Sequence, residues 1–252
     1  MVRHFLTFFA GVRYLLTVAT FSWNGYDLWY RVAYFGAIIS YGVVIYKSFG
    51  VPRTDKAYVQ RALMDENVQY LVIAIYWCYI KPISITLIPY ITFSLFHLLT
   101  FTRTTILPAT QGSETSSSSG LSKTIQTWVK DNYDRAMRFV SYAEVVIFVR
   151  VLVGAILFRN SLLAPLLYAH FLRLRFYMSS FTRAAFQHVR SELDSLTQNP
   201  SCPPVVRKGY LMLTDLVTRY ASTVLSINKD QPATRPTPQS STPADPTKVK
   251  TR

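Results

Sequence analysis

Three charged side chains, Arg13, Glu144 and Arg150, lie inside long apolar runs. An ionised group at the centre of a bilayer costs about 2.5–3.5 kcal/mol on insertion scales, so each should face other helices and find a partner. Glu144 is the only carboxylate inside an apolar run, and Arg150 follows it at a spacing of six residues, which does not bring side chains of one helix together. We therefore predict an interhelical ion pair between Arg13 and Glu144.

Such a pair serves either as a step in a proton or ion path or as a structural clamp between helices. A path normally needs several ionisable groups in sequence, which favours the clamp. The chain contains no His-x-x-x-x-Asp, His-Glu-x-x-His or Gly-x-Ser-x-Gly motif and no glycine-rich phosphate loop. We therefore expect no catalysis, no cofactor and no metal site.

Half of the 252 residues are hydrophobic and only 16% are charged, compared with about 25% in an ordinary soluble domain. The apolar residues fall in six runs, at 4–23, 32–46, 68–80, 83–102, 139–158 and 162–172. Runs of this length and composition are typical of membrane-spanning helices. The sequence predicts an all-α polytopic membrane protein.

The basic residues are concentrated in segments 47–67 and 103–138 and in everything after residue 172, whereas the turns at 81–82 and 159–161 hold one each. Because basic segments stay in the cytosol, this asymmetry predicts three helical hairpins whose turns face the lumen. A competing model has fewer full spans and one basic loop in the lumen. Membrane topology also accounts for the net charge of +14, so we expect no nucleic-acid partner.

Two basic helices are predicted after the membrane runs, because apolar residues recur there every three or four positions. Helices of this kind beside a membrane bind its surface through apolar and basic side chains. The residues we expect to contact the bilayer are Phe181, Arg183, Val189, Arg190, Arg207 and Lys208. Packing of the two stripes on each other or on other helices explains the same pattern, since periodicity shows only that one face must be covered.

Composition divides the chain into five segments. These are membrane hairpins at 1–107, a disordered serine-rich linker at 108–123, further membrane helices at 124–178, cytosolic amphipathic helices at 179–228 and a disordered basic tail at 229–252. If Arg252 is counted as the first residue from the C-terminal end, Lys250 is the third and Lys248 is the fifth. This spacing resembles the Lys-x-Lys-x-x retrieval signal that coatomer reads. The same charges also suit an import receptor, and two lysines in a basic tail also occur by chance.

Several segments resemble one family of the eukaryotic endoplasmic reticulum, that of vertebrate transmembrane protein thirty-three and the yeast pore-membrane nucleoporin of thirty-three kilodaltons. The similar segments are residues 61–71, 88–97, 143–144, 168–176 and 201–208, and they occur in the order of the family. The resemblance covers roughly residues 5 to 225. It implies residence in the endoplasmic reticulum membrane and nuclear envelope, with reticulon-type shaping proteins and nucleoporins as partners.

The resemblance and the hairpins together lead to one functional hypothesis. We expect a non-enzymatic protein that shapes or organises membrane of the endoplasmic reticulum and nuclear envelope and contributes to nuclear pore distribution or assembly. The alternative is a regulatory subunit of a membrane channel or stress sensor, which acts through contacts inside the membrane. The sequence leaves open whether the nuclear pore or the peripheral reticulum is the main location.

Overall fold

A computed structural model describes residues 2–20, 26–110, 116–199, 202–212, 214–215 and 219. These residues form helices and short connections and contain no strand, as predicted for an all-α membrane protein. Residues 1–194 make up one compact unit and residues 195–252 a second. The predicted retrieval lysines, Lys248 and Lys250, lie outside the described residues.

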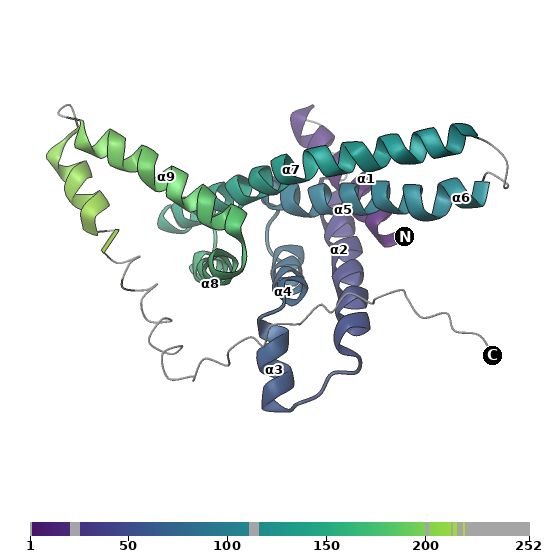
Figure 1. Cartoon of the computed structure of the whole chain (residues 1–252). Helices are drawn as coiled ribbons and strands as arrows, with labels where there is room; N and C mark the ends of the chain where they lie inside the picture. The colour runs from purple at the N-terminus through teal and green to yellow at the C-terminus, as the bar shows by residue number, and fades with distance from the viewer. Residues whose placement is uncertain are drawn as a thin grey trace, which may run out of the picture. The chain divides into compact units, whose positions relative to one another are not determined.

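The helices follow one another with short connections (Figure 1). Their bounds are α1 Val2–Ala19, α2 Tyr26–Phe49, α3 Lys56–Leu63, α4 Glu66–Tyr79, the 3-10 turn η1 Ser84–Leu87, α5 Ile88–Phe101, the π-helical turn η2 Thr102–Ile106, α6 Leu107–Thr110, α7 Ser116–Ile156, α8 Leu163–Met178 and α9 Ser180–Gln198. A further helical segment covers 204–212.

Two of the three predicted hairpins have arms that pack on each other, whereas α4 packs on α2 and α8 rather than along α5. Helix α1 packs against α2, and α7 packs against α8. The long apolar stretch from 68 to 102 breaks where Lys81-Pro82 predicted, because α4 ends at Tyr79 and the next helical turn begins at Ser84. The turns meet at one end of the unit, where Tyr26, Pro82 and Arg150 line one cavity and Lys81 and Arg159 line another.

The two arms of each hairpin differ in length. In the described part of the chain, three helical stretches are long and apolar enough to cross a membrane by themselves: Tyr26–Phe49, Ser84–Ala109 and Gly120–Ile156. Helices α4 and α8 have 14 and 16 residues. At a rise of 1.5 Å per residue they are about 21 and 24 Å long, shorter than a hydrocarbon core of about 30 Å. The six apolar runs of the sequence are therefore three long helices and three shorter ones.

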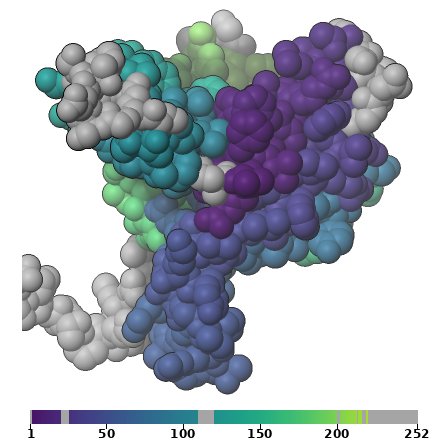
Figure 2. Space-filling view, turned by 90° about the vertical axis from the view of Figure 1, so that its right-hand side faces the viewer, coloured from purple at the N-terminus to yellow at the C-terminus, as the bar shows by residue number. Residues whose placement is uncertain are grey.

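Helices α5, η2 and α6 run alongside α7 and cross α2 (Figure 1). The predicted serine-rich linker at 108–123 is largely helical where the structure describes it, since 108–110 belong to α6 and 116–123 to α7. Serine tolerates a helix interior when a long neighbouring segment propagates the helix, because each added residue gains one backbone hydrogen bond. Helix α3 projects from the packed helices, and none of its residues is buried (Figure 2).

Small residues allow α1 and α2 to approach closely. Ala10 and Gly11 of α1 and Ala33, Gly36 and Ala37 of α2 are all buried. A Cβ atom built on Gly36 would lie 2.9 Å from the backbone nitrogen of Thr7. Close backbone approach through small residues is the usual way in which helices associate inside membranes.

Candidate functional site

The buried carboxylate of Glu144 forms an ion pair with Arg175 of α8. Arg175 Nε lies 3.4 Å from Glu144 Oε1, and Arg175 Nη1 lies 2.9 Å from Glu66 Oε2 at the start of α4. The Glu144 side chain is fully buried and that of Arg175 is 6% exposed, whereas Glu66 is 46% exposed. One guanidinium thus joins three helices, α4, α7 and α8, and we call these three residues the charge network.

Tyrosines of α4 and α5 surround the charge network. The Tyr70 hydroxyl donates a hydrogen bond to Glu144 Oε1, and the Tyr90 hydroxyl donates one to the backbone carbonyl of Tyr70 over 3.0 Å. Arg175 Cζ also lies 5.3 Å from the centre of the Tyr70 ring, a cation–π distance. Tyr70 therefore stabilises both charges of the pair, the carboxylate through its hydroxyl and the guanidinium through its ring.

The three charged residues are at similar distances from the turn ends of their helices. Glu144, Arg175 and Glu66 each lie about 12 or 13 residues from those ends, which corresponds to about 18–20 Å of helix. Counting residues from each predicted turn would have shown that the three charged residues lie at similar distances from the turns. Arg175 falls within the predicted membrane segment 124–178 but beyond the last apolar run, which ends at residue 172, so it was not considered as a partner of Glu144.

The predicted pairing of Glu144 with Arg13 is wrong, because the structure gives Glu144 a different partner. Arg13 lies on an exposed face of α1, beside the buried Tyr14, and makes no ion pair with any described residue. Helix α1 packs on α2 and α5, whereas Glu144 faces α4 and α8. Hydropathy identified the buried acid correctly but carried no information about which helix lies opposite.

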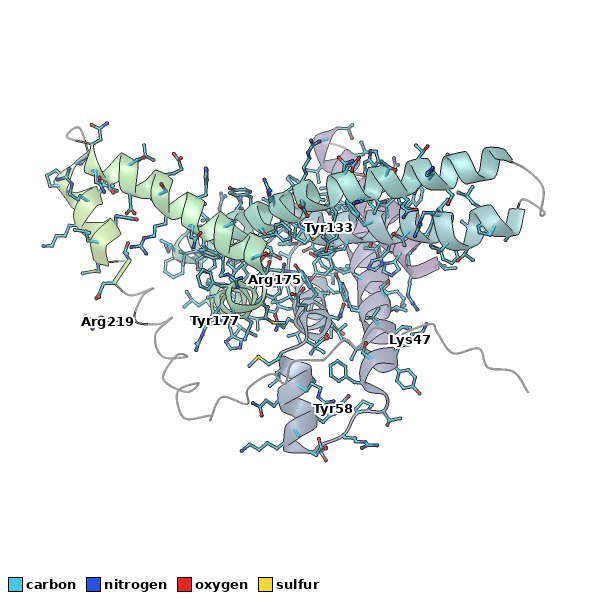
Figure 3. The ribbon with its side chains drawn as sticks, viewed as in Figure 1. Lys47, Tyr58, Tyr133, Arg175, Tyr177 and Arg219 are labelled. Atoms are coloured by element: carbon cyan, nitrogen blue, oxygen red, sulfur yellow. The ribbon has the colours of Figure 1, made fainter. Side chains whose placement is uncertain are left out.

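The geometry of the charge network suits a clamp. Its hydrogen bonds end on a backbone carbonyl at Tyr70, so the hydroxyls do not pass a proton onward to the next polar cluster. Glu144 Oε2 is buried and accepts no hydrogen bond from the described protein atoms. A cavity of about 200 Å³ adjoins Arg175 and Glu66, with Tyr133 of α7 and Phe181 of α9 in its lining. Figure 3 labels Arg175 on α8 and Tyr133 on α7. In the described residues, no three His, Cys, Asp or Glu side chains group as metal ligands would.

A second polar cluster lies near the hairpin turns and is centred on Thr86 of η1. The hydroxyls of Tyr30 and Tyr34, both on α2, lie 3.1 and 2.7 Å from Thr86 Oγ1, which itself donates to the carbonyl of Ile83 over 2.7 Å. Nearby, the Tyr14 hydroxyl lies 3.0 Å from Ser84 Oγ. Irregular backbone at membrane depth is tolerated only where protein groups satisfy it, and here the Thr86 hydroxyl bonds the carbonyl of Ile83, which directly precedes η1.

We expect Thr86→Val to lower the free energy of unfolding by about 1–3 kcal/mol, because two buried tyrosine hydroxyls lose their partner. The matched control is Thr92→Val, since the Thr92 hydroxyl donates only to the carbonyl of Ile88 in its own helix. Thermal unfolding of the purified protein in detergent measures both changes. Equal effects of the two variants would contradict the role of Thr86.

Arg183 and Arg207 were predicted to bind the membrane. In the structure, each of these side chains caps the C-terminal end of a helix. Arg183 Nη1 donates to the carbonyls of Phe176 and Tyr177 at the end of α8, over 3.2 and 3.0 Å. Arg207 donates in the same way to Thr197 and Asn199 at the end of α9, over 2.9 and 3.2 Å. Carbonyls at a helix C-terminus lack backbone partners, and a cation there also complements the helix dipole.

The remaining predicted membrane contacts divide between buried and exposed positions. Phe181 and Val189 are half-buried, on the stripe that also carries the buried Ala185. Arg190 is exposed and pairs with Asp194 at 3.7 Å, and Lys208 is exposed. The first half of the α9 stripe therefore packs on protein, which is the alternative that periodicity left open.

The helical hairpins, the apolar helices and the charged clamp inside them define an all-α polytopic membrane protein. A family model described as Transmembrane protein 33/Nucleoporin POM33 matches residues 1–223, and the chain belongs to this family. The resemblance of the sequence to this family is thereby confirmed.

The chain is similar to several named proteins of other organisms. The chain is 32% identical over 221 residues to Pore membrane protein of 33 kDa of Saccharomyces cerevisiae, covering 82% of this chain and 77% of the relative. It is 29% identical to Tetra-spanning protein 1 of Schizosaccharomyces pombe, over 85% and 79% of the two chains. It is 24% identical to human Transmembrane protein 33, over 68% of each chain. No solved structure matches.

Proposed function

We propose that this protein is a non-enzymatic organiser of membrane in the endoplasmic reticulum and nuclear envelope that contributes to the distribution or assembly of nuclear pore complexes. Membership of the family supports a membrane location at the nuclear pore and reticulum, since relatives are named as a pore membrane protein and a nucleoporin. Nucleoporins and reticulon-type shaping proteins are the partners that this function requires.

The observation that carries the proposal is the unequal arms of the hairpins. The turns of the hairpins line neighbouring cavities, and the long arms continue for more residues away from those turns than the short arms do. In the predicted topology the ends away from the turns are cytosolic, so this difference in length would place more helical volume on the cytosolic side. A molecule of this form adds more area to the cytosolic leaflet and favours curvature such as that of a pore rim.

The exposed end of α9 adds to the same effect. Leu193 and Leu196 continue the apolar stripe of this helix but are 41% and 64% exposed. In the helical segment 204–212, Val205 and Leu211 are 82% and 61% exposed, and the segment also carries the exposed cation Lys208. Apolar side chains with neighbouring cations insert at the boundary between headgroups and acyl chains. The membrane-binding part of the tail thus begins after Val189.

We expect the purified full chain to tubulate or fenestrate liposomes that contain anionic lipid, and the double variant Leu193→Asp, Leu196→Asp to lose most of this activity. The matched control is Gln187→Asp, Ser191→Asp, which adds the same charge to the opposite, exposed face of α9. Electron microscopy of the liposomes measures the reshaping. The proposal fails if the wild type leaves liposomes spherical, or if both double variants reshape them equally.

A further inference from the structure

Three cations that are distant in the sequence line one cavity at the turn end of the hairpins. Lys81 follows α4, Arg150 lies in the last third of α7, and Arg159 follows α7. The cavity has a volume of about 590 Å³, within the range of ligand sites. Its other lining residues are Tyr76, Ile80, Pro82, Ile83, Phe158, Asn160 and Ser161.

The positive charge of this cavity is not balanced by described protein groups. No carboxylate lines it, and none of the three cations forms an ion pair with a described residue. Asp27, in the first turn of α2, is exposed and lines neither this cavity nor its neighbour. All three cations are exposed, and an anionic group bound between them would interact favourably with three positive charges.

Two polar atoms of the lining also lack partners. The Tyr76 hydroxyl and Asn160 Oδ1 are covered from solvent and make no hydrogen bond with the described protein atoms. The Asn160 amide is oriented by its Nδ2, which donates to the carbonyl of Val151 over 2.9 Å, so Oδ1 is left as an acceptor. Tyr76 and Asn160 line the cavity through their other atoms, and a rotation of either side chain would bring its unpaired polar atom to a ligand.

An apolar groove leads from this cavity toward the middle of the helices. A neighbouring cavity of about 360 Å³ shares Pro82, Ile83 and Arg150 with the first and is extended by Ile85 and Val146. Arg150 lies about 9 Å and Val146 about 15 Å along α7 from its end at the turn, at 1.5 Å per residue. Val146 is 50% exposed, so the groove is open to acyl chains of the bilayer.

We propose that this cavity binds the phosphate group of an anionic phospholipid with a hydroxyl-bearing headgroup, and that the neighbouring groove takes one acyl chain. Arginine guanidinium groups bind phosphate through paired charge-assisted hydrogen bonds, and Arg150 and Arg159 provide two of them. Rotation of their side chains would let the Tyr76 hydroxyl donate to a phosphate oxygen and Asn160 Oδ1 accept from a headgroup hydroxyl. Choline headgroups are disfavoured because their own cation would meet three others. The inference is independent of the proposed function, and in the predicted topology the lipid belongs to the lumenal leaflet.

The test is isothermal titration calorimetry of the full chain in neutral detergent with dioctanoyl phosphatidylinositol, dioctanoyl phosphatidylcholine and inorganic phosphate. We expect phosphatidylinositol to bind at least about tenfold more tightly than either of the others, because phosphatidylcholine brings a cation of its own to the three cations and inorganic phosphate has no acyl chain. Equal binding of the two lipids would overturn the anionic selectivity. Binding of inorganic phosphate as tight as that of the lipid would overturn the lipid as ligand and leave a phosphate site.

Variants locate the binding. We expect Arg150→Gln and Arg159→Gln each to weaken the binding of phosphatidylinositol about tenfold, and Tyr76→Phe, which removes only a hydroxyl, to weaken it about threefold to fivefold. The control is Arg13→Gln, which removes an exposed cation from an apolar helix away from the cavity and should leave binding unchanged. The site would be refuted if Tyr76→Phe and either arginine variant, measured separately, both bound phosphatidylinositol as tightly as the wild type. It would also be refuted if Arg13→Gln lost as much affinity as Arg150→Gln and Arg159→Gln do.

Discussion

Arg175→Leu is expected to lower the free energy of unfolding by about 3–5 kcal/mol, because it leaves the carboxylate of Glu144 buried and without a countercharge. Glu144 is fully buried, and its other interaction, the hydrogen bond from Tyr70, does not neutralise it. Chemical or thermal unfolding of the purified protein in detergent measures the loss. The exposed pair of Arg190 and Asp194 is the control, since Arg190→Leu should change stability by at most about 1 kcal/mol.

A double-mutant cycle separates the pair from the rest of the charge network. In the Glu144→Gln background the buried charge is gone, so Arg175→Leu should cost much less than it does alone, and the two losses should not add. Arg13→Leu should be additive with Glu144→Gln, because Arg13 is exposed and does not contact Glu144. Additive losses for Arg175 and Glu144 would show that the two residues are not energetic partners.

The break between α4 and α5 could be predicted from the sequence because it depends on local signals. Lys81-Pro82 divides a stretch too long for one span, and a helix cannot continue through the proline. Pro89, by contrast, lies in the first turn of α5, where its missing N–H has no cost. Helix lengths were less predictable, since composition marked the residues near Ser116 as linker, although a long helix extends through them.

The candidate site was predicted only in part. Burial of Glu144 followed from its position in an apolar run, but its partner depends on which helices are neighbours, and that is decided by packing along the whole chain. Arg175 stands in the last turn of α8, where a cation is usually explained by the helix dipole. The cavity that we propose to bind phosphate could not be predicted from the sequence. Lys81 and Arg159 are single charges in two separate turns, and only the fold brings them close to Arg150.

In the tail helices, periodicity predicted an apolar face but not what covers that face. The stripe through Phe181, Val189 and Leu196 was correctly predicted to be one helical face, yet protein covers its first part and leaves its last part exposed. Arg183 and Arg207 were predicted to bind the membrane because they lie on basic amphipathic helices, whereas their side chains bind the carbonyls at helix ends. Charge and period do not distinguish a capping arginine from one that binds lipid.

Gly36→Ala is expected to lower the free energy of unfolding by about 3 kcal/mol, at the upper end of what overpacking costs. The added Cβ would lie 2.7 Å from Thr7 Oγ1, 2.9 Å from the backbone nitrogen of Thr7 and 3.0 Å from the backbone oxygen of Arg3. Two of these three atoms belong to the backbone of α1 and cannot rotate away, so the two helices of the first hairpin would have to separate. The variant should therefore unfold at lower temperature, and a larger side chain such as valine should prevent folding of the hairpin.

Gly42→Ala, farther along the same helix, is the matched control because no heavy atom lies within 4 Å of its Cβ position. There alanine only improves helix propensity, by up to about 1 kcal/mol, so the control should be neutral or slightly stabilising. The two identical substitutions in α2 should thus change stability in opposite directions. Thr7→Ala removes the nearest side-chain atom but leaves the backbone nitrogen in place, so it should restore only a small part of the loss in Gly36→Ala. Full rescue by Thr7→Ala would mean that a hydroxyl, and not close backbone approach, sets the distance between α1 and α2.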